Sequence, residues 1–509
     1  MMDNNKKMSS DYLQSDFYFG GKLYMTKFPN YTKTIFIDGQ WLEAHNGNTL
    51  PVQNPATLET ITEVSYGDEV EAEQAVRAAS QAFPQWSAKT ARERSQLLYA
   101  AYEKMLEHKE ELASILTTEQ GKPLKEARAE IDSAASYFLW YAEEANRLYG
   151  EIIPSSNKHK RLMVIPQPIG VVAAITPWNF PASMITRKLA PALAAGCTVV
   201  LKPAPETPLT AYQIVKILEE VGIPKGVVNL VTGDAVSIGQ CWMNHPDVRL
   251  ITFTGSTEVG KLLMKGSADH VKKLSLELGG HAPIIVFDDA DLDLAAEMTL
   301  ASKFRNCGQT CICANRVYVQ KTIWDDFLEK LKEKVRRLSI DIGAKETADI
   351  GPLINEEAVQ KVQRHLEDAV QKGASVVYGG KRWDGPYPGY FFEPTVLVNV
   401  TKEMRVMNEE TFGPLLPLQP FEEEEEAIRQ ANDTPYGLAA YIFTDSIHRA
   451  YRVMEKLEYG IIGINDVFPA VAEAPFGGVK QSGLGKEGGK EGIFEFVELK
   501  YVSMGIRPS

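Results

Sequence analysis

The chain has 509 residues, which predicts about three structural units and excludes a peptide hormone, a single small binding module and a disulfide knot. Hydrophobic residues make up 44% and charged residues 24% of the chain, as in soluble globular proteins, which excludes disordered and fibrous classes. The formal net charge of -13 repels polyanions and disfavours nucleic acid as a partner.

The amino-terminal segment lacks the apolar core that a secretory signal needs, so we expect a cytoplasmic protein. We interpret residues 1–30 as an N-terminal extension, either a flexible tail or a docking arm. The longest apolar run, residues 189–201, contains Pro191 and is too short to span a bilayer. A membrane partner is therefore not expected.

Two patterns of periodicity follow along the chain. Between Val70 and Gly150, three amphipathic patterns, one of them the run 92–124, predict surface helices. After Gly170, short apolar strands alternate with helical stretches, which is typical of a parallel sheet covered on both faces. These predicted strands are residues 170–176, 198–203, 227–231, 250–255 and 283–287.

A second alternation begins at Arg316 and predicts a second α/β domain, with the boundary near Gly279–Gly280. Its predicted elements are strands at 316–320, 374–380, 391–397 and 437–444 and a helix at 324–338. Five consecutive glutamates at 422–426 are interpreted as the solvated start of a helix, because carboxylates complement the positive end of the helix dipole.

The nucleotide-binding signals are incomplete. The chain has no G-x-G-x-x-G opening a helix, and residues 255–261 match a P-loop only until Leu262, where Ser or Thr would ligate magnesium. The turn at Gly255 and Ser256 can still hold one phosphate group at a helix N-terminus. Lys202 ends a neighbouring strand, in the crevice where open α/β sheets bind ligands.

Three of the five cysteines, Cys307, Cys311 and Cys313, fall within seven positions in a loop before a strand. Structural zinc is not expected, because no nearby His or C-x-x-C pair completes four ligands. A buried inert thiol is the ordinary alternative, but the cluster favours a reactive thiolate in a reducing compartment. Glu277 and His281 are the candidate bases, and spacing alone does not decide between them.

Seven motifs occur in order: PWNFP, KPAPETP, FTGSTEVGK, LELGGHAP, GQTC, EETFGP and APFGGVKQSGLGKEGG. Together they resemble the NAD(P)-dependent aldehyde dehydrogenase superfamily over essentially the whole chain after about residue 33. The resemblance implies an α/β fold with two doubly wound α/β domains and a small bridging oligomerisation element. It implies a cofactor-binding domain at 31–145 and 168–279, a catalytic domain at 280–479, and the oligomerisation element at 146–167 and 480–509.

The resemblance also implies a cysteine mechanism. Cys311 matches the family nucleophile, Glu277 its general base, and Asn179 the amide that stabilises the oxyanion. Thiolate attack on an aldehyde creates an alkoxide, which donors from Asn179 and the Cys311 backbone would stabilise. After hydride transfer, a carboxylate at Glu277 can activate the water that hydrolyses the thioester.

The implied cofactor is NAD or NADP, and no metal is required. The residues matched to the family's cofactor site are Trp178, Lys202, Pro205, Gly255, Ser256, Leu278, Glu410 and Phe412. Lys202 and Glu410 would meet the ribose units, and Phe412 would pack by the nicotinamide. Because Pro205 stands where NAD-strict members often carry a glutamate, with Glu206 following it, we expect both cofactors to work.

The stretches 184–208, 305–316 and 473–489 look most like the succinate-semialdehyde dehydrogenase branch. There, Arg187 and Arg305 match residues that bind the distal carboxylate; the alternative for each is a helix-end or inter-domain ion pair. The branch commonly has a serine near Ala470, so glutarate semialdehyde and neutral aldehydes remain open as substrates. Cys313 resembles a reversible disulfide partner of the nucleophile, or is a small apolar filler.

Two rival functions remain from other classes. A catalytically retired structural homologue is disfavoured by the intact Cys311, Glu277 and Asn179. A coenzyme-A-dependent acylating dehydrogenase is disfavoured by Glu277, which that type commonly lacks. The family forms homodimers or homotetramers through the bridging element, and the branch implies a place in 4-aminobutyrate breakdown.

Overall fold

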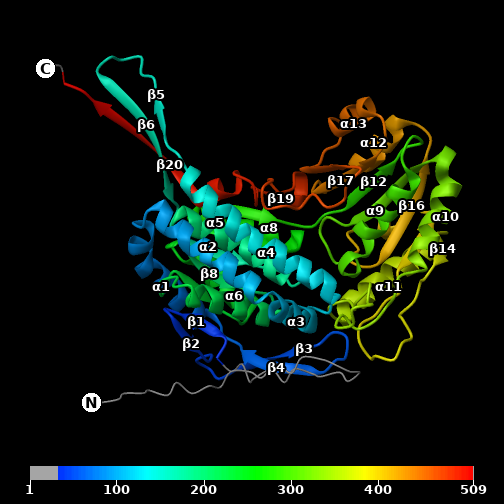
Figure 1. Ribbon diagram of the computed structural model, residues 1–509, viewed down its shortest axis with the longest axis horizontal. Helices are drawn as coiled ribbons and strands as arrows, with labels where there is room; N and C mark the ends of the chain where they lie inside the picture. The colour runs from blue at the N-terminus through cyan, green and yellow to red at the C-terminus, as the bar shows by residue number, and fades with distance from the viewer. Residues whose placement is uncertain (1–32, 508–509) are drawn as a thin grey trace.

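The computed structural model describes residues 33–507, and the extension predicted at 1–30 lies outside them. Figure 1 shows two bodies side by side, each built on one large sheet, with a small sheet projecting from the first body. The predicted α/β fold class is confirmed. Among the described residues, no helix is both long and apolar enough to cross a membrane.

The first sheet has eight strands in the order β19-β11-β10-β7-β8-β9-β1-β2. Neighbours from β11 to β9 pair in parallel, while β19, β1 and β2 add antiparallel edges. The bounds are β1 Ile35–Ile37, β2 Gln40–Leu42, β7 Val171–Ile175, β8 Thr198–Lys202, β9 Val228–Leu230, β10 Val248–Thr254, β11 Lys273–Glu277 and β19 Gly483–Leu484.

Helices cover both faces of this sheet, because its central strands are apolar on both sides. Alternate residues of β7 enter opposite cores: Val172 packs in one and Ala173 in the other. The helices of this body are α1 Glu69–Ser87, α2 Ala91–Glu107, α3 Lys109–Gln120, α4 Leu124–Glu144, α5 Pro181–Ala195, α6 Pro208–Glu220, α7 Ala235–Asn244 and α8 Thr257–Ser267.

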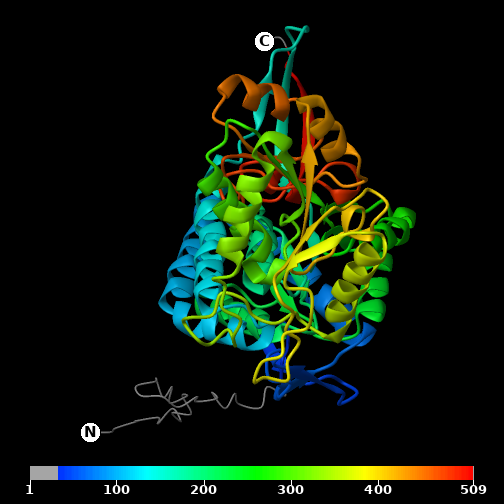
Figure 2. The ribbon, with the colours of Figure 1, turned by 90° about the vertical axis from the view of Figure 1, so that its right-hand side faces the viewer.

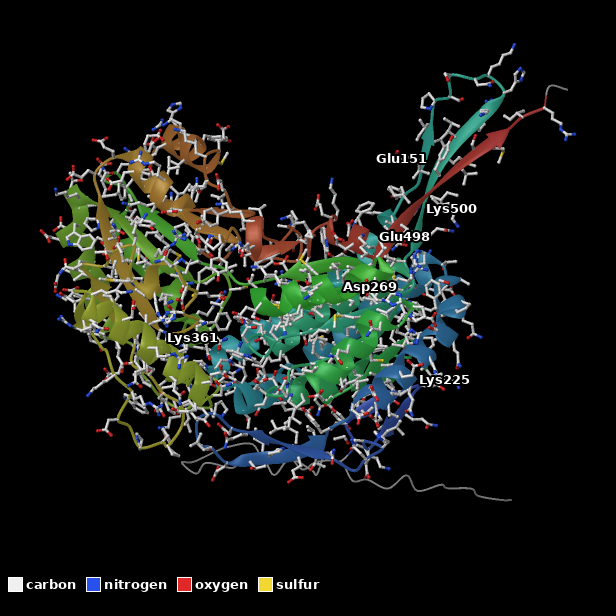
Figure 3. All side chains as sticks on the ribbon, turned by 180° about the vertical axis from the view of Figure 1, so that it is seen from behind. Glu151, Lys225, Asp269, Lys361, Glu498 and Lys500 are labelled. Atoms are coloured by element: carbon white, nitrogen blue, oxygen red, sulfur yellow. The ribbon has the colours of Figure 1, made fainter. Side chains whose placement is uncertain are left out.

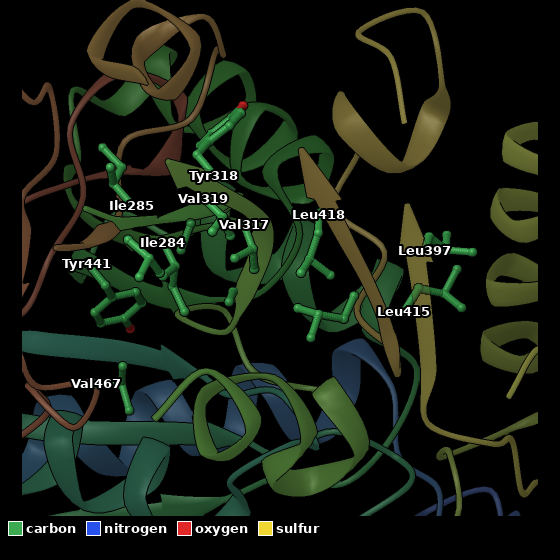
Figure 4. Close-up of a cluster of buried hydrophobic side chains, with 14 of the residues drawn as sticks. Ile284, Ile285, Val317, Tyr318, Val319, Leu397, Leu415, Leu418, Tyr441 and Val467 are labelled. Atoms are coloured by element: carbon green, nitrogen blue, oxygen red, sulfur yellow. The ribbon is translucent and has the colours of Figure 1, made fainter. Parts of the chain in front are cut away.

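The second sheet has seven strands in the order β14-β15-β16-β13-β12-β17-β18, and only β14 pairs antiparallel. Figure 4 shows its apolar core, where Ile284, Val317 and Leu418 lie together. The strands are β12 Ala282–Val286, β13 Ala314–Gln320, β14 Ser375–Tyr378, β15 Thr395–Val398, β16 Leu415–Phe421, β17 Ala439–Phe443 and β18 Ile461–Ile464. The helices are α9 Leu292–Phe304, α10 Trp324–Val335, α11 Glu356–Gln371, α12 Glu424–Asn432 and α13 Ile447–Met454.

Two small sheets lie at opposite ends of the molecule (Figures 1 and 2). The projecting sheet joins β5 (Glu151–Ile153), β6 (Lys160–Pro168) and β20 (Val497–Gly505), all antiparallel. Figure 3 labels Glu151, Glu498 and Lys500 along it. The other pair is β3 (Thr49–Gln53) with β4 (Thr60–Ser65).

The predicted strands are confirmed, as is the helical start at Glu424–Glu426, but the amino-terminal helices differ from the prediction. The single predicted run 92–124 is two helices, α2 and α3, so four helices rather than three lie between residues 69 and 144. His108 ends one and begins the next, with φ -96° and ψ 15°. No glycine or proline marks this break, which is why the periodicity concealed it.

The chain passes from the first sheet to the second between Glu277 and Ala282. The division into domains, with its boundary near Gly279–Gly280, stays a prediction. Within residues 480–507, β20 joins the projecting sheet whereas β19 pairs with β11 of the first sheet.

Candidate active site

The site is built at one edge of the first sheet. Because β7, β8, β10 and β11 run parallel, their carboxyl ends meet at the same edge, where open sheets bind ligands. Asn179 follows β7, Lys202 ends β8, Gly255 follows β10 and Glu277 ends β11. The Gly255 amide donates to the Glu277 carbonyl at 3.0 Å, which ties the last two turns together.

The loop that carries Cys311 has an unusual backbone. Asn306, Cys307 and Gly308 have positive φ values of 49°, 55° and 76°, and two of them are not glycine. The Asn306 side chain compensates by donating to the carbonyls of Asn179 (3.0 Å) and Gln309 (3.2 Å). This strained turn brings the loop that carries Cys311 against the segment after β7.

The Asn179 side chain is 4% exposed, and its Nδ2 donates to the Gln309 carbonyl at 3.1 Å. An amide nitrogen carries two N–H groups, so one remains available for a ligand oxygen. The hydrogen bond that is already made fixes the direction of the second. The side chain is therefore suited to donate to an oxyanion formed near the Cys311 loop.

Cys311 is partly exposed and interacts electrostatically with the buried carboxyl of Glu277. Burial, followed by the nearby Glu410 and Glu277 carboxylates, raises the pKa of the Cys311 thiol to about 12. Burial and Glu487 raise the pKa of Glu277 well above its usual value, against the opposing effect of Arg187. Neither Glu277 oxygen has a hydrogen-bond partner among the described residues. An unpaired buried carboxyl is poised to take a proton.

His281, the alternative base, is fully buried and otherwise engaged. Its Nε2 lies 3.3 Å from the Val406 carbonyl, and its ring packs near Tyr436. Burial, with the charge of Arg316, lowers its pKa well below the usual value. Glu277 is therefore the better candidate.

The residues matched to a cofactor site fit a dinucleotide. Lys202 is 3% exposed, and its ammonium donates one long hydrogen bond of 3.3 Å to the Pro203 carbonyl, which leaves donors for a ligand. Burial lowers its pKa to about 8, while Glu206 and Asp234 oppose the loss of its proton. Ser256 caps α8 by accepting from the Val259 amide at 3.3 Å, so the neighbouring helix amides face the same edge.

The second body contributes Glu410 and Phe412. Glu410 accepts from the Gly280 amide at 2.9 Å, and burial raises its pKa to about 7. A Cβ at Gly279 would lie 2.9 Å from the Glu410 carboxylate, so glycine keeps this approach open. Phe412 meets Trp178 edge-on, with ring centroids 5.5 Å apart.

The remaining residues of that set lie close by. Leu278 is 6% exposed, and its amide donates to the Ser482 carbonyl at 2.9 Å. Its side chain would lie 2.4 Å from a Cβ at Gly260, so it packs directly on α8. Pro205 is exposed beside Lys202 and adds no charge there.

The two arginines differ sharply in surroundings. Arg187 is 3% exposed, its Nε lies 3.2 Å from a Glu487 carboxylate oxygen, and it stacks 4.0 Å over the Phe476 ring. It thus forms the structural ion pair that was the alternative for this residue, although Nε and Nη2 lack well-directed hydrogen bonds.

Arg305 is half-buried between the rings of Phe180 and Phe468, at 5.6 and 5.5 Å. It has no ion pair among the described residues, so it can meet an anion.

Cys313 points away from the solvent. Its thiol donates to the Gly308 carbonyl at 3.3 Å, and Lys303 Nζ lies 3.7 Å from its sulfur. Cys307 is also buried, and all five cysteines are free thiols. A disulfide between Cys311 and Cys313 stays a prediction.

Sequence reasoning missed the strand β11 that carries Glu277, because Lys273–Glu277 is short and half polar. It also missed Lys122 and Glu130, which lie beside Asn179. Both belong to the charged stretch 122–130, where the sequence does not distinguish solvent-facing from buried charges. Only the tertiary pairing separates them.

Comparison with known proteins gives a consistent result. A model of the aldehyde dehydrogenase family matches residues 41–502. A mitochondrial succinate-semialdehyde dehydrogenase from Oryza sativa subsp. japonica is 53% identical over 469 residues, covering 92% of this chain and 89% of that protein. An NADP+ succinate-semialdehyde dehydrogenase from Escherichia coli strain K12 is 52% identical over 476 residues, covering 94% and 98%. A glutarate-semialdehyde dehydrogenase from Pseudomonas putida is 53% identical over 476 residues, covering 94% and 98%.

Solved structures agree. The crystal structure of an E. coli NADP-dependent enzyme superimposes with a TM-score of 0.92 at 52% identity, covering 94% of this chain and 98% of that one. A betaine aldehyde dehydrogenase from Staphylococcus aureus in complex with NAD+ also gives 0.92, at 40% identity, covering 94% and 96%.

Proposed function

The chain belongs to the aldehyde dehydrogenase family, and from this premise we propose that it oxidises succinate semialdehyde to succinate with NAD+ or NADP+. The observation that carries the proposal is the buried Glu277 carboxyl, which has no hydrogen-bond partner among the described residues and whose charge helps to raise the pKa of the Cys311 thiol. A cysteine nucleophile and a carboxylate base that act on each other are the two groups that thioester chemistry requires.

Catalysis begins when the Cys311 thiol passes its proton to the Glu277 carboxylate, because the raised pKa of the thiol makes a base necessary at neutral pH. Glu277 releases this proton to solvent before the hydrolysis step. The thiolate adds to the aldehyde carbon, and the carbonyl oxygen becomes an alkoxide. The free N–H of Asn179 and the Cys311 backbone amide donate to this oxygen, which stabilises the charge as it forms. NAD+ or NADP+, when bound, would supply the hydride acceptor that thioester formation requires.

Glu277 completes the cycle. Its ionised carboxylate takes a proton from water, the hydroxide adds to the thioester carbon, and the C–S bond breaks to release the acid and the thiolate. The raised pKa of Glu277 increases its affinity for that proton. The cofactor would be held by polar groups of Lys202, Ser256 and Glu410 and by the aromatic ring of Phe412.

Substrate choice rests on Arg305, whose guanidinium lies near two aromatic rings and forms no ion pair among the described residues. A planar fork of donors binds a carboxylate through two hydrogen bonds. Glutarate semialdehyde is the second candidate, because Ala470 takes the place of a serine and a glutarate-semialdehyde dehydrogenase is 53% identical. Both substrates carry a distal carboxylate.

Several finer assignments belong to the same proposal. We infer a homodimer or homotetramer assembled through the projecting sheet, a cytoplasmic location and a role in 4-aminobutyrate breakdown. A reversible Cys311–Cys313 disulfide would require Cys313 to leave its contacts with Gly308 and Lys303.

The test is cofactor reduction measured with succinate semialdehyde, glutarate semialdehyde and propanal, each with NAD+ and NADP+. We expect the two acidic aldehydes to have the higher kcat/KM, and Cys311→Ala to lose oxidation while still binding cofactor. Repeating the assay with coenzyme A separates hydrolysis from acyl transfer. If the cofactor is reduced with none of the aldehydes, the protein is a catalytically retired homologue. A strict requirement for coenzyme A would instead identify an acylating dehydrogenase.

A further inference from the structure

The backbone carbonyl of Asn179 accepts two strong hydrogen bonds. Lys122 Nζ donates to it at 2.7 Å and Asn306 Nδ2 at 3.0 Å. The same residue's side chain donates to Gln309 at 3.1 Å. The peptide that carries the oxyanion amide is thus held from both sides, and the donor on one side is a charged amine.

That amine is completely enclosed. Lys122 is 1% exposed and forms an ion pair with Glu130 at 2.7 Å, in which neither side chain exceeds 1% exposure. Its nitrogen also lies 3.7 Å from the centroid of the Phe180 ring. An ammonium has three N–H donors, and these three partners account for all of them.

Glu130 connects this contact to a helix. Its other carboxylate oxygen accepts from the amides of Ala182 (2.8 Å) and Ser183 (3.3 Å), in the first turn of α5. One carboxylate therefore fixes the start of α5 while its lysine partner fixes the peptide two residues before that helix. Asn179 has little freedom to turn between them.

A buried ion pair is poor at adding stability, because desolvation offsets much of the Coulomb attraction. Such a pair is better suited to set geometry. We propose that Lys122 is a positioning residue that, with Glu130, orients the Asn179 amide toward the reacting oxygen at Cys311. This inference rests on the proposed function, since it names the support of that same oxyanion site.

The test uses a pair of substitutions that leaves no buried charge behind. In Lys122→Met/Glu130→Gln, the methionine fills the lysine's volume and the glutamine oxygen still accepts from the α5 amides. We expect kcat/KM for succinate semialdehyde to fall about 10–100-fold, as when an oxyanion donor is displaced. The cofactor dissociation constant should change less than about twofold. Lys125→Met, at an exposed neighbour paired with Asp349, is the matched control and should retain full activity.

A double-mutant cycle separates positioning from general damage. In an Asn179→Ala background, the same pair of substitutions should reduce kcat/KM by less than about twofold, because the group it positions is absent. An equal loss in both backgrounds would overturn the inference, as would a variant with wild-type activity. If the pair does not fold, Lys122→Met alone is taken through the same cycle and judged by the same criterion.

Failure of this inference is distinct from failure of the proposed function. A wild-type protein that oxidises none of the aldehydes removes the proposed function and this inference with it. An active wild type whose Lys122 variants keep full activity overturns this inference alone.

Discussion

At the scale of single residues, the site is defined by acidic groups that hold their protons more strongly than usual. Burial raises the pKa of both the Glu277 carboxyl and the Cys311 thiol, and the Glu410 and Glu277 carboxylates raise the pKa of the thiol further. Arg187 acts in the opposite direction on both. Chemistry that starts from a thiolate and a carboxylate is therefore sensitive to pH.

The direction in which kcat/KM changes with pH follows from these pKa shifts. Both groups act only after losing a proton and both have raised pKa values, so kcat/KM should increase steadily from about pH 6 to about pH 9. A steady-state pH profile with succinate semialdehyde measures this. A profile that is flat, or that falls over this range, would contradict the role of at least one of the two groups.

Arg305 has a separable effect. Arg305→Ala removes the guanidinium that can bind a distal carboxylate, so KM for succinate semialdehyde should rise about 10–100-fold. KM for propanal, which has no carboxylate, should change less than about twofold. Equal increases for both aldehydes would show that Arg305 acts on the structure of the pocket and not on the substrate.

At the scale of elements, buried glutamates cap the helices that follow the functional loops. Neither α5 nor α6 has a side-chain cap at its own N-cap residue. Glu130 accepts from amides of α5, and Glu119 accepts from Leu209 and Thr210 of α6 at 2.8 Å each. Residues from α3 and α4 thus fix the two turns that carry Asn179 and Lys202.

The sequence predicts the elements whose pattern is local. The apolar strands at 170–176 and 198–203 and the residues that end them were identifiable, because burial on both faces leaves a continuous apolar run. The left-handed turn at Asn306 and Cys307 was not, since neither residue is glycine. The Lys122–Glu130 pair was also not predictable, because its role depends on the contact of Lys122 with Asn179, which lies 57 residues further along the chain.

One surface turn stores strain that can be relieved. Val271 follows a short 3-10 helix with φ 49° and ψ 42°, a left-handed conformation that a β-branched residue rarely adopts, and it is 89% exposed. Val271→Gly should increase the free energy of unfolding by about 0.5–1 kcal/mol, since few contacts are lost. Denaturant unfolding of the two proteins measures the difference. A lower stability would show that the valine makes a needed contact.

At the scale of the whole molecule, the projecting sheet leaves apolar side chains exposed on both of its faces. Ile152 is 80% exposed, and Leu499 and Tyr501 on the opposite face are 65% and 60% exposed. A three-stranded sheet standing away from the body cannot bury these side chains itself (Figure 1). This supports the proposal that a second subunit covers them.

Leu499→Asp should therefore lower the molar mass in solution, because a buried unpaired carboxylate opposes association. Light scattering coupled to size exclusion measures the mass. Val236→Asp, at an apolar residue of α7 with a similar exposure of 66%, is the control and should leave the mass unchanged. An unaltered mass for Leu499→Asp would remove the sheet from the interface.

The central claim is that Cys311 becomes acylated and Glu277 releases the acid. It is tested most directly by the intact mass of Glu277→Gln after mixing with succinate semialdehyde and NAD+ or NADP+ at alkaline pH, where the thiol ionises without help. We expect a gain of one succinyl group per subunit, located on Cys311 by peptide mapping and absent from Cys311→Ala. No adduct despite cofactor reduction, or an adduct on another residue, would contradict it.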